Sequence, residues 1–228
     1  MMIHYFTKEE KLLWILSALA IIFSFARGGG DFITLVASLI GITSILFDAK
    51  GNPFGQILMV IFSLIYGIIS YSYAYYGEMI TYLGMTMPMA VLAFVAWMRH
   101  PYQGDKREVE VATMTKREYR QMTVLAVGVT VFFYFVLRYF DTANLYPSTL
   151  SVTTSFVAVY LTYKRSHYFS IAYAANDVIL IVLWIFATLD DVRYASVAVC
   201  FVAFLANDLY AYYCWRRMGE RQRRELLE

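Results

Sequence analysis

The chain has 228 residues, of which 60% are hydrophobic, 18% aromatic and only 16% charged, with a formal net charge of +2 and a mean hydropathy of +0.55. Ordinary soluble domains contain about 25% charged residues, so this composition excludes a disordered chain, a collagen-like repeat and a typical soluble enzyme. The small net charge also argues against a nucleic-acid partner. We therefore expect a single unit that crosses a membrane several times.

Eight apolar runs separated by short polar breaks predict eight transmembrane helices. Most runs approach the roughly 20 residues that a helix needs to cross a bilayer. A backbone in lipid must satisfy its own hydrogen bonds, and the runs are too continuously apolar for the strands of a barrel, so the prediction is an all-α membrane protein. The predicted spans are residues 12–26, 32–47, 54–76, 79–98, 121–140, 147–163, 168–188 and 194–214.

The breaks between the spans carry residues that favour turns. Residues 27–31 (Arg-Gly-Gly-Gly-Asp) predict one tight turn, and residues 48–53 (Asp-Ala-Lys-Gly-Asn-Pro) predict another, in which Pro starts the next helix. The longest polar stretch runs over residues 99–120. Within it, Thr115 and Glu118 have the spacing of a capping box that begins the fifth span.

Lys and Arg are distributed unequally between the two sides that eight spans define. With the N-terminus inside, the outer segments contain only Arg27, Arg138 and Arg193 of the 19 basic residues. Cytoplasmic loops carry the excess of Lys and Arg in membrane proteins. We therefore expect a multi-pass protein of the bacterial plasma membrane with both termini in the cytoplasm.

The first span is open to two interpretations. Ser24-Phe25-Ala26 resembles a signal-peptidase site, which would make the segment a cleaved leader. The acidic pair Glu9 and Glu10 is unusual in the charged region of a leader. We therefore expect a retained helix.

Two segments of similar pattern predict an internal repeat. Residues 54–97 and 169–215 each read as two helices that end in Trp close to a basic residue, and each follows one helix and a short basic turn. The single crossing between the two groups gives them the same orientation, and such parallel repeats form a substrate site at their interface near the midplane. The expected organisation is an extra N-terminal helix (1–30), a first three-helix repeat (31–98), a cytoplasmic loop (99–120), a linker helix (121–145), a second three-helix repeat (146–216) and a cytoplasmic tail (217–228).

Polar side chains within the predicted spans indicate a solute pathway. Asn176-Asp177 and Asn207-Asp208 lie in two adjacent spans, away from the loops, where an Asp costs roughly 2.5–3.5 kcal/mol on insertion, so both pairs are expected to face the bundle interior. Ser, Thr and Asn at such positions also serve as packing residues between helices, which is the alternative interpretation. The candidate substrate-binding residues are Gln56, Tyr66, Thr154, Tyr173, Asn176, Asp177, Trp184, Asn207, Asp208 and Tyr210.

A pocket of this composition suits a small polar solute with a flat ring. Aromatic faces stack on heterocycles or attract a cationic ring, and amides and carboxylates bind hydroxyl groups. The sequence has no cluster of metal ligands, and we expect no metal, cofactor or catalytic residue. Cys200 and Cys214 are not expected to form a disulfide, because they lie about 21 Å apart along one helix.

The chain resembles the nicotinamide riboside transporters of the PnuC family over nearly its whole length. The resemblance rests on the three-plus-one-plus-three layout with an extra N-terminal helix and on the motifs Tyr76-Gly77-Glu78, Asn176-Asp177 followed by Leu183-Trp184, and Asn207-Asp208-Leu209-Tyr210 running to Trp215. It implies a fold like an enlarged SWEET sugar carrier and facilitated diffusion of a vitamin precursor that cytosolic phosphorylation traps. Asn176 would match the ribose-contacting Asn of the family, with Tyr173, Trp184, Asn207 and Tyr210 as pocket walls.

The substrate is left open by one departure from the family pattern. Riboside carriers often have Trp-x-x-Trp before this Asn, whereas the matching stretch here is residues 169–172 (Phe-Ser-Ile-Ala), and Trp184 could supply the stacking face instead. Related members carry thiamine, riboflavin or nucleosides.

Two other classes remain as alternatives. One is a proton-coupled channel with Asp177 and Asp208 as the relay. The other is an intramembrane enzyme, although His4, His100 and His167 lie at or beyond span ends and offer no Ser–His dyad. The expected partners are a small-molecule substrate and the lipid bilayer, with a second copy of the chain as a further option and no nucleic acid.

Overall fold

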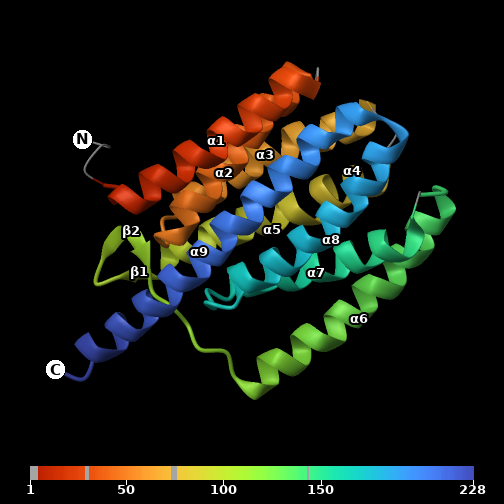
Figure 1. The fold of residues 1–228 in the computed structure, drawn as a ribbon. Coiled ribbons are helices and arrows are strands. Elements are labelled where there is room, and N and C mark those ends of the chain that lie inside the picture. The colour runs from red at the N-terminus through yellow and green to blue at the C-terminus, as the bar shows by residue number, and fades with distance from the viewer. Residues whose placement is uncertain (1–4, 29–30, 73–75, 143) are drawn as a thin grey trace.

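The computed structural model describes residues 5–28, 31–72, 76–142 and 144–228, and these form an antiparallel bundle of helices (Figure 1). Within the described residues, seven helices are long and apolar enough to cross a membrane. The spans are α1 (Lys8–Gly28), α2 (Phe32–Ala49), α3 (Phe54–Ser72), the fourth span made of α4 (Tyr76–Thr81), a π-helical turn (Tyr82–Thr86) and α5 (Met87–Arg99), then α6 (Lys116–Tyr139), α7 (Leu145–Tyr163), α8 (Phe169–Asp190) and α9 (Ala195–Glu225), with a 3-10 turn at Val192–Tyr194.

The sixth span, α7, is not among these seven; it has the length of a membrane helix but is rich in Ser and Thr. It packs against α8, α6 and α5, which shield its hydroxyl groups from lipid. Several of these hydroxyls donate to the carbonyl one turn earlier, as Thr149 does to Leu145 (2.8 Å) and Thr153 to Thr149 (2.9 Å). Burial by neighbouring helices and local hydrogen bonds together explain how so polar a helix lies inside the bundle.

The helices α1 and α6 form opposite flanks of the bundle, and α9 runs through it (Figure 1). α9 packs against α8, α2 and α1, while α6 packs mainly against α7. Large apolar side chains of α6, among them Val124, Val127, Phe132 and Phe135, are exposed. An exposed apolar face of this length is what a lipid-facing helix presents.

The fourth span is irregular at the position that Pro88 predicts. Pro has no backbone N–H, so it cannot donate to the preceding turn of a helix. Here the residues just before α5 form the π-helical turn Tyr82–Thr86, and Pro88 occupies the first turn of α5. A π-helical turn adds a residue to the helical turn and often occurs at functional sites.

The loop predicted at residues 99–120 is partly a β-hairpin, so the chain is not entirely helical. Strands β1 (Pro101–Tyr102) and β2 (Asp105–Val109) pair antiparallel. After the hairpin, Val109 N donates to Gly51 O (2.9 Å) and Ala112 N to Arg165 O (3.0 Å). The segment therefore connects the α2–α3 turn to the α7–α8 turn. We call the end of the bundle that carries this hairpin the hairpin end.

The helix α9 extends beyond the eighth predicted span, residues 194–214, through most of the predicted tail to Glu225. Ion pairs one helical turn apart, Arg216–Glu220 and Arg221–Glu225, accompany this extension. The extension also contacts the loop, since Gln222 Oε1 accepts from Val111 N (2.8 Å). The start of α1, the end of α9 and the hairpin lie at the same end of the bundle (Figure 1).

Local sequence signals set the helix ends. The capping box is confirmed: Thr115 Oγ1 accepts from Glu118 N (3.3 Å), and Glu118 Oε2 accepts from Thr115 N (2.9 Å). Asp31 caps α2 by accepting from Ile33 N (3.4 Å), whereas Gly29 and Gly30 of the predicted turn lie outside the described residues. Cys200 and Cys214 are both free thiols.

Candidate functional site

A central cavity of about 40 Å³ lies between the two hydrophobic clusters of the bundle. One side of its wall is polar, with Asp48 of α2, Asn176 and Asp177 of α8, and Asp208 of α9. The rest of the wall is mainly aromatic. The aromatic lining residues are Phe62, Tyr82, Phe169, Tyr173, Phe201 and Phe204. Rings and carboxyl groups thus meet in one enclosed space within the membrane-spanning helices.

Asp177 and Asp208 bring two carboxyl groups together across α8 and α9. Each residue is only 4% exposed, and the two side chains interact directly. No Lys, Arg or His is among the residues that line the cavity. An ionisable group inside a membrane protein is costly and usually marks a ligand or ion pathway, and here two of them share one wall.

Asp48 is the third carboxyl group of the cavity, and its position is fixed by neighbours. Gln56 Nε2 donates to Asp48 Oδ1 (2.8 Å), and Trp215 Nε1 donates to the Asp48 carbonyl (2.6 Å). A Cβ on Gly55 would lie 2.2 Å from Asp48 Oδ1, so only Gly fits there. Lys50, two residues after Asp48 in the chain, forms an ion pair with Glu10 (3.1 Å) and not with Asp48. Asp48 therefore faces the cavity without a basic partner among the described residues that line it.

Asn176 is oriented by two hydroxyl groups of α7. Ser151 Oγ and Thr154 Oγ1 both donate to Asn176 Oδ1, at 3.1 and 2.9 Å. An amide oxygen accepts at most two hydrogen bonds through its lone pairs, so this oxygen is saturated. The amide nitrogen remains as the donor that Asn176 can offer to a solute. Thr154, which does not itself line the cavity, thus acts through Asn176.

The structure places Trp184 and Tyr66 away from the central cavity. Trp184 shares a face of α8 with Asn176, but eight residues along a helix correspond to about 12 Å. It packs against Tyr194 instead, with ring centroids 5.6 Å apart. Tyr66 stacks behind the cavity wall, on Phe62 at 5.5 Å and against Tyr82 at 4.6 Å. Both rings were expected to contact a solute directly, and neither lines the cavity.

Asn207 and Tyr210 also point elsewhere, toward α1. Asn207 Nδ2 donates to Ser17 Oγ (2.9 Å) and to the Ala203 carbonyl (2.7 Å). Tyr210 lies beside Thr7 and Cys214. Successive residues of a helix are rotated by about 100°, so α9 cannot direct Asn207, Asp208 and Tyr210 into the same space. Of the residues expected on α9, only Asp208 reaches the cavity.

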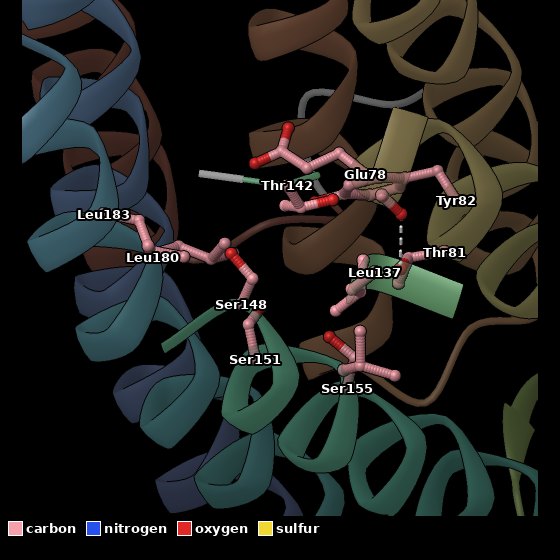
Figure 2. Close-up of a pocket in the computed structure, with 12 residues that line it drawn as sticks. Glu78, Thr81, Tyr82, Leu137, Thr142, Ser148, Ser151, Ser155, Leu180 and Leu183 are labelled. Atoms are coloured by element: carbon pink, nitrogen blue, oxygen red, sulfur yellow. Dashed lines mark hydrogen bonds between the residues drawn. The ribbon is translucent and has the colours of Figure 1, made fainter. Parts of the chain in front are cut away.

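A second pocket, also of about 40 Å³, lies at the end of the bundle opposite the hairpin. It is formed by the start of α4, the end of α6, the first half of α7 and the second half of α8. Figure 2 shows Glu78 and Thr142 at one end of this pocket and Ser155 at the other. Tyr82 and Ser155 line both pockets, so these two side chains separate them. Tyr82 is the first residue of the π-helical turn.

An aromatic cluster closes the central cavity toward the hairpin end. Phe169, in the cavity wall, meets Trp215 edge-on at a centroid distance of 4.8 Å, and Trp215 lies 5.2 Å from Trp97. Trp97 and Trp215 are fully buried. The cavity is therefore bounded by Tyr82 and Ser155 at one end and by these rings at the other.

A comparison with family models identifies the family. A family model described as Nicotinamide mononucleotide transporter matches residues 31–217. The chain belongs to this transporter family. A curated relative, the nicotinamide riboside transporter PnuC of Neisseria mucosa, is 24% identical over 92% of this chain and 81% of its own length. The protein of the same name from Haemophilus influenzae is 20% identical over 94% of this chain and 92% of its own length.

The fold of the transporter family is seen in a solved structure. The crystal structure of the vitamin B3 transporter PnuC superimposes with a TM-score of 0.82, covering 95% of this chain and 94% of that one, at 22% identity. The chain is thus a multi-pass, helical membrane protein with the fold of that transporter, and its homologues are named as transporters.

Several cavity residues of this family member were not anticipated from the sequence. Asp48 was assigned only to a turn, yet its side chain lines the cavity. The sequence signal that indicates such a role is the pairing of Asp48 with Gln56, which lies eight positions later on the next helix. The aromatic lining residues of α3 and α9 carry no distinguishing pattern, because Phe is common throughout the spans.

Proposed function

We propose that this chain carries nicotinamide riboside across the membrane by facilitated diffusion through the central cavity. The observation on which the proposal rests is the charge of the wall: the carboxyl groups of Asp48, Asp177 and Asp208 line the cavity, and no basic residue lines it. Nicotinamide riboside has a permanently cationic pyridinium ring and an uncharged sugar. Carboxyl groups and aromatic faces both stabilise such a ring.

The same charge distribution favours the riboside over the mononucleotide that appears in the family description. A phosphate carries about −1.5 to −2 charges at pH 7 and is normally bound by Arg, Lys or helix N-termini. The lining offers carboxyl groups in their place, which would repel it. The two relatives are named for the riboside, in agreement with this proposal.

The remaining lining groups account for the other parts of the solute. Asn176 can donate through its amide nitrogen to a sugar hydroxyl or to the carboxamide, since its oxygen is already satisfied by Ser151 and Thr154. Phe169 provides an aromatic face at the start of the stretch that differs from the Trp-x-x-Trp pattern. A cavity of about 40 Å³ holds a few water molecules, so the walls must move apart when a ring enters.

The movement we propose is a rocking of two three-helix groups, α2 to α5 and α7 to α9, with α6 as the linker and α1 as the extra N-terminal helix. Equivalent contacts at the hairpin end support this parallel repeat. Lys50 and Lys164 cap α2 and α7 in the same way, and the residues that follow, Gly51 and Arg165, both adopt positive φ (65° and 57°). The two halves are thus alike where they meet the connecting loop.

The orientation that we propose places the hairpin end in the cytoplasm of a bacterial cell. The support is the distribution of Lys and Arg, which leaves only Arg27, Arg138 and Arg193 on the opposite side. The pocket near Glu78 would then face the outside, and the Trp97–Trp215 cluster would face the cytoplasm.

Uptake into proteoliposomes of purified protein tests the function. Labelled nicotinamide riboside should enter saturably without an ion gradient, and unlabelled riboside should compete. Nicotinamide mononucleotide should compete poorly. Thiamine, riboflavin and a nucleoside serve as the substrate panel. Stronger competition by any of these, or by the mononucleotide, would contradict the substrate assignment, and no saturable uptake of any panel member would contradict transport itself.

A further inference from the structure

We propose that the second pocket is a separate binding site for an organic cation, with Glu78 as the counter-charge, where the solute binds before it reaches the central cavity. The proposal rests on the function proposed above and adds a second station to it. It is carried by the composition of the pocket, by the position of Glu78 and by the wall that the two pockets share.

Glu78 places a carboxyl group in this pocket without a basic neighbour. None of the residues that line the pocket is Lys, Arg or His. Glu78 Oε2 is buried, and the hydrogen bonds that the carboxyl group receives come from hydroxyl groups and not from a cation. The side chains beside the carboxyl group include Tyr66 and Ser70, which are uncharged. A buried carboxylate needs a counter-charge, and a cationic solute would supply it.

The other walls suit the rest of a riboside. Figure 2 shows Thr142 beside Glu78, with Ser148 and Ser151 further along the pocket and the apolar side chains of Leu137 and Leu180 on opposite sides of it. The ring of Tyr82 borders the pocket as well. An amphipathic solute, with a charged flat ring and a sugar, meets a carboxylate, an aromatic face and hydroxyl groups here.

The shared wall connects this site to the central cavity. Tyr82 and Ser155 line both pockets, so a solute that moves between them has to pass these side chains. Tyr82 belongs to the π-helical turn, where a change to regular α-helix would rotate its side chain relative to α7. The solute would therefore pass from one acidic site to another across a single aromatic side chain.

The test measures uptake from the outside by cells that lack their own riboside transporter. Glu78→Gln keeps the size of the side chain and removes its charge. We expect the KM for nicotinamide riboside to rise about tenfold, the loss that corresponds to one charge-assisted contact. Reduced dihydronicotinamide riboside has nearly the same shape and no charge, and its uptake should hardly change in the variant.

Two further variants make the test specific. Asp141→Asn removes an exposed carboxylate next to the lining residue Thr142, at a positive φ (50°) that Asn tolerates, and should leave the KM unchanged. Ser148→Lys leaves Glu78 intact but adds a competing ammonium group to the pocket. It should raise the KM for nicotinamide riboside and not for the neutral analogue. This variant tests the site independently if Glu78→Gln does not reach the membrane.

The results separate this site from the function on which it rests. Normal wild-type uptake with an unchanged KM in Glu78→Gln, or an equal rise for the neutral analogue, would overturn the site and leave the transport function standing. No riboside uptake by the wild type would overturn both.

Discussion

Trp97 and Trp215 lie against each other at the hairpin end, and each donates its indole N–H to a carbonyl in the opposite half of the bundle. Trp97 Nε1 donates to Thr162 O of α7 (2.9 Å), and Trp215 Nε1 donates to Asp48 O of α2 (2.6 Å). Thr162 and Asp48 both stand two residues before the capping Lys of their helices. This exchange joins α5 to α7 and α9 to α2 at one point, and it fixes the backbone of a cavity residue, Asp48.

Replacing either tryptophan should therefore destabilise the protein, and the effects of the two substitutions should depend on each other. Trp97→Phe and Trp215→Phe each remove a buried donor, and we expect each to lower the free energy of unfolding by about 1–3 kcal/mol. Thermal unfolding in detergent measures this. Because the rings touch, the double variant should deviate from additivity by about 0.5–3 kcal/mol. Trp14→Phe, which removes an indole bond to Thr43, is the control and should add independently. Additivity of the first pair would contradict the exchange.

Adjacent residues of α9 should differ in what they control. Asp208→Asn removes a carboxylate from the cavity wall, and we expect the KM for nicotinamide riboside to rise about tenfold, which corresponds to one lost charged contact. Asn207→Ala breaks the bond to Ser17 and should lower stability by about 1–3 kcal/mol with an unchanged KM. Initial uptake rates and thermal unfolding of both variants decide this. A larger KM effect from Asn207 than from Asp208 would mean that α9 is rotated relative to this structure.

A similar contrast is expected on α8. Asn176→Ala removes the amide donor from the cavity and should weaken riboside binding by about tenfold, measured by calorimetry on purified protein. Trp184→Ala leaves the cavity lining intact but removes a buried ring, so it should lower the free energy of unfolding by about 3–5 kcal/mol. Riboside affinity should stay the same in the folded fraction. If Trp184→Ala weakened binding as much as Asn176→Ala, the solute would bind further along α8.

Gly55 provides a way to displace Asp48 without changing it. A Cβ at residue 55 would lie 2.2 Å from Asp48 Oδ1, so Gly55→Ala must push the carboxyl group away from Gln56. Such overpacking costs typically about 1–3 kcal/mol, and we expect a raised KM together with lower thermal stability. Gly128→Ala is the matched control, because nothing lies within 4 Å of its Cβ position. Wild-type behaviour of Gly55→Ala would show that Asp48 is not held as described.

The helix pattern of this protein could be predicted from the sequence because residues inside the membrane and residues in loops differ clearly in hydrophobicity. The length of the apolar runs predicted the eight spans, and the spacing of Thr115 and Glu118 predicted the start of α6. The hairpin and the end of α9 were missed for a related reason. Both lie outside the apolar runs, where only local charge pairs and contacts such as Gln222 with Val111 determine the structure.

The site could be predicted only in part, because hydropathy does not fix how a helix is rotated. Asp177, Asp208, Asn176 and Tyr173 were expected at a pocket and do line the cavity. Asn207 could not be distinguished from Asp208 without knowing which side of α9 faces α1. Glu78 was noted only as part of a motif, since its environment is formed by α6 and α7, far away in the chain.

Substrate counterflow tests the central claim most directly. Proteoliposomes are preloaded with unlabelled nicotinamide riboside and diluted into a trace of labelled riboside, with equal pH and salt on both sides. A carrier that equilibrates the riboside predicts that label rises transiently above its outside concentration and then falls as the internal pool leaves. Label that never exceeds the level in protein-free liposomes, or that accumulates only when a pH gradient is applied, would contradict a uniport of nicotinamide riboside through the cavity of Asp177 and Asp208.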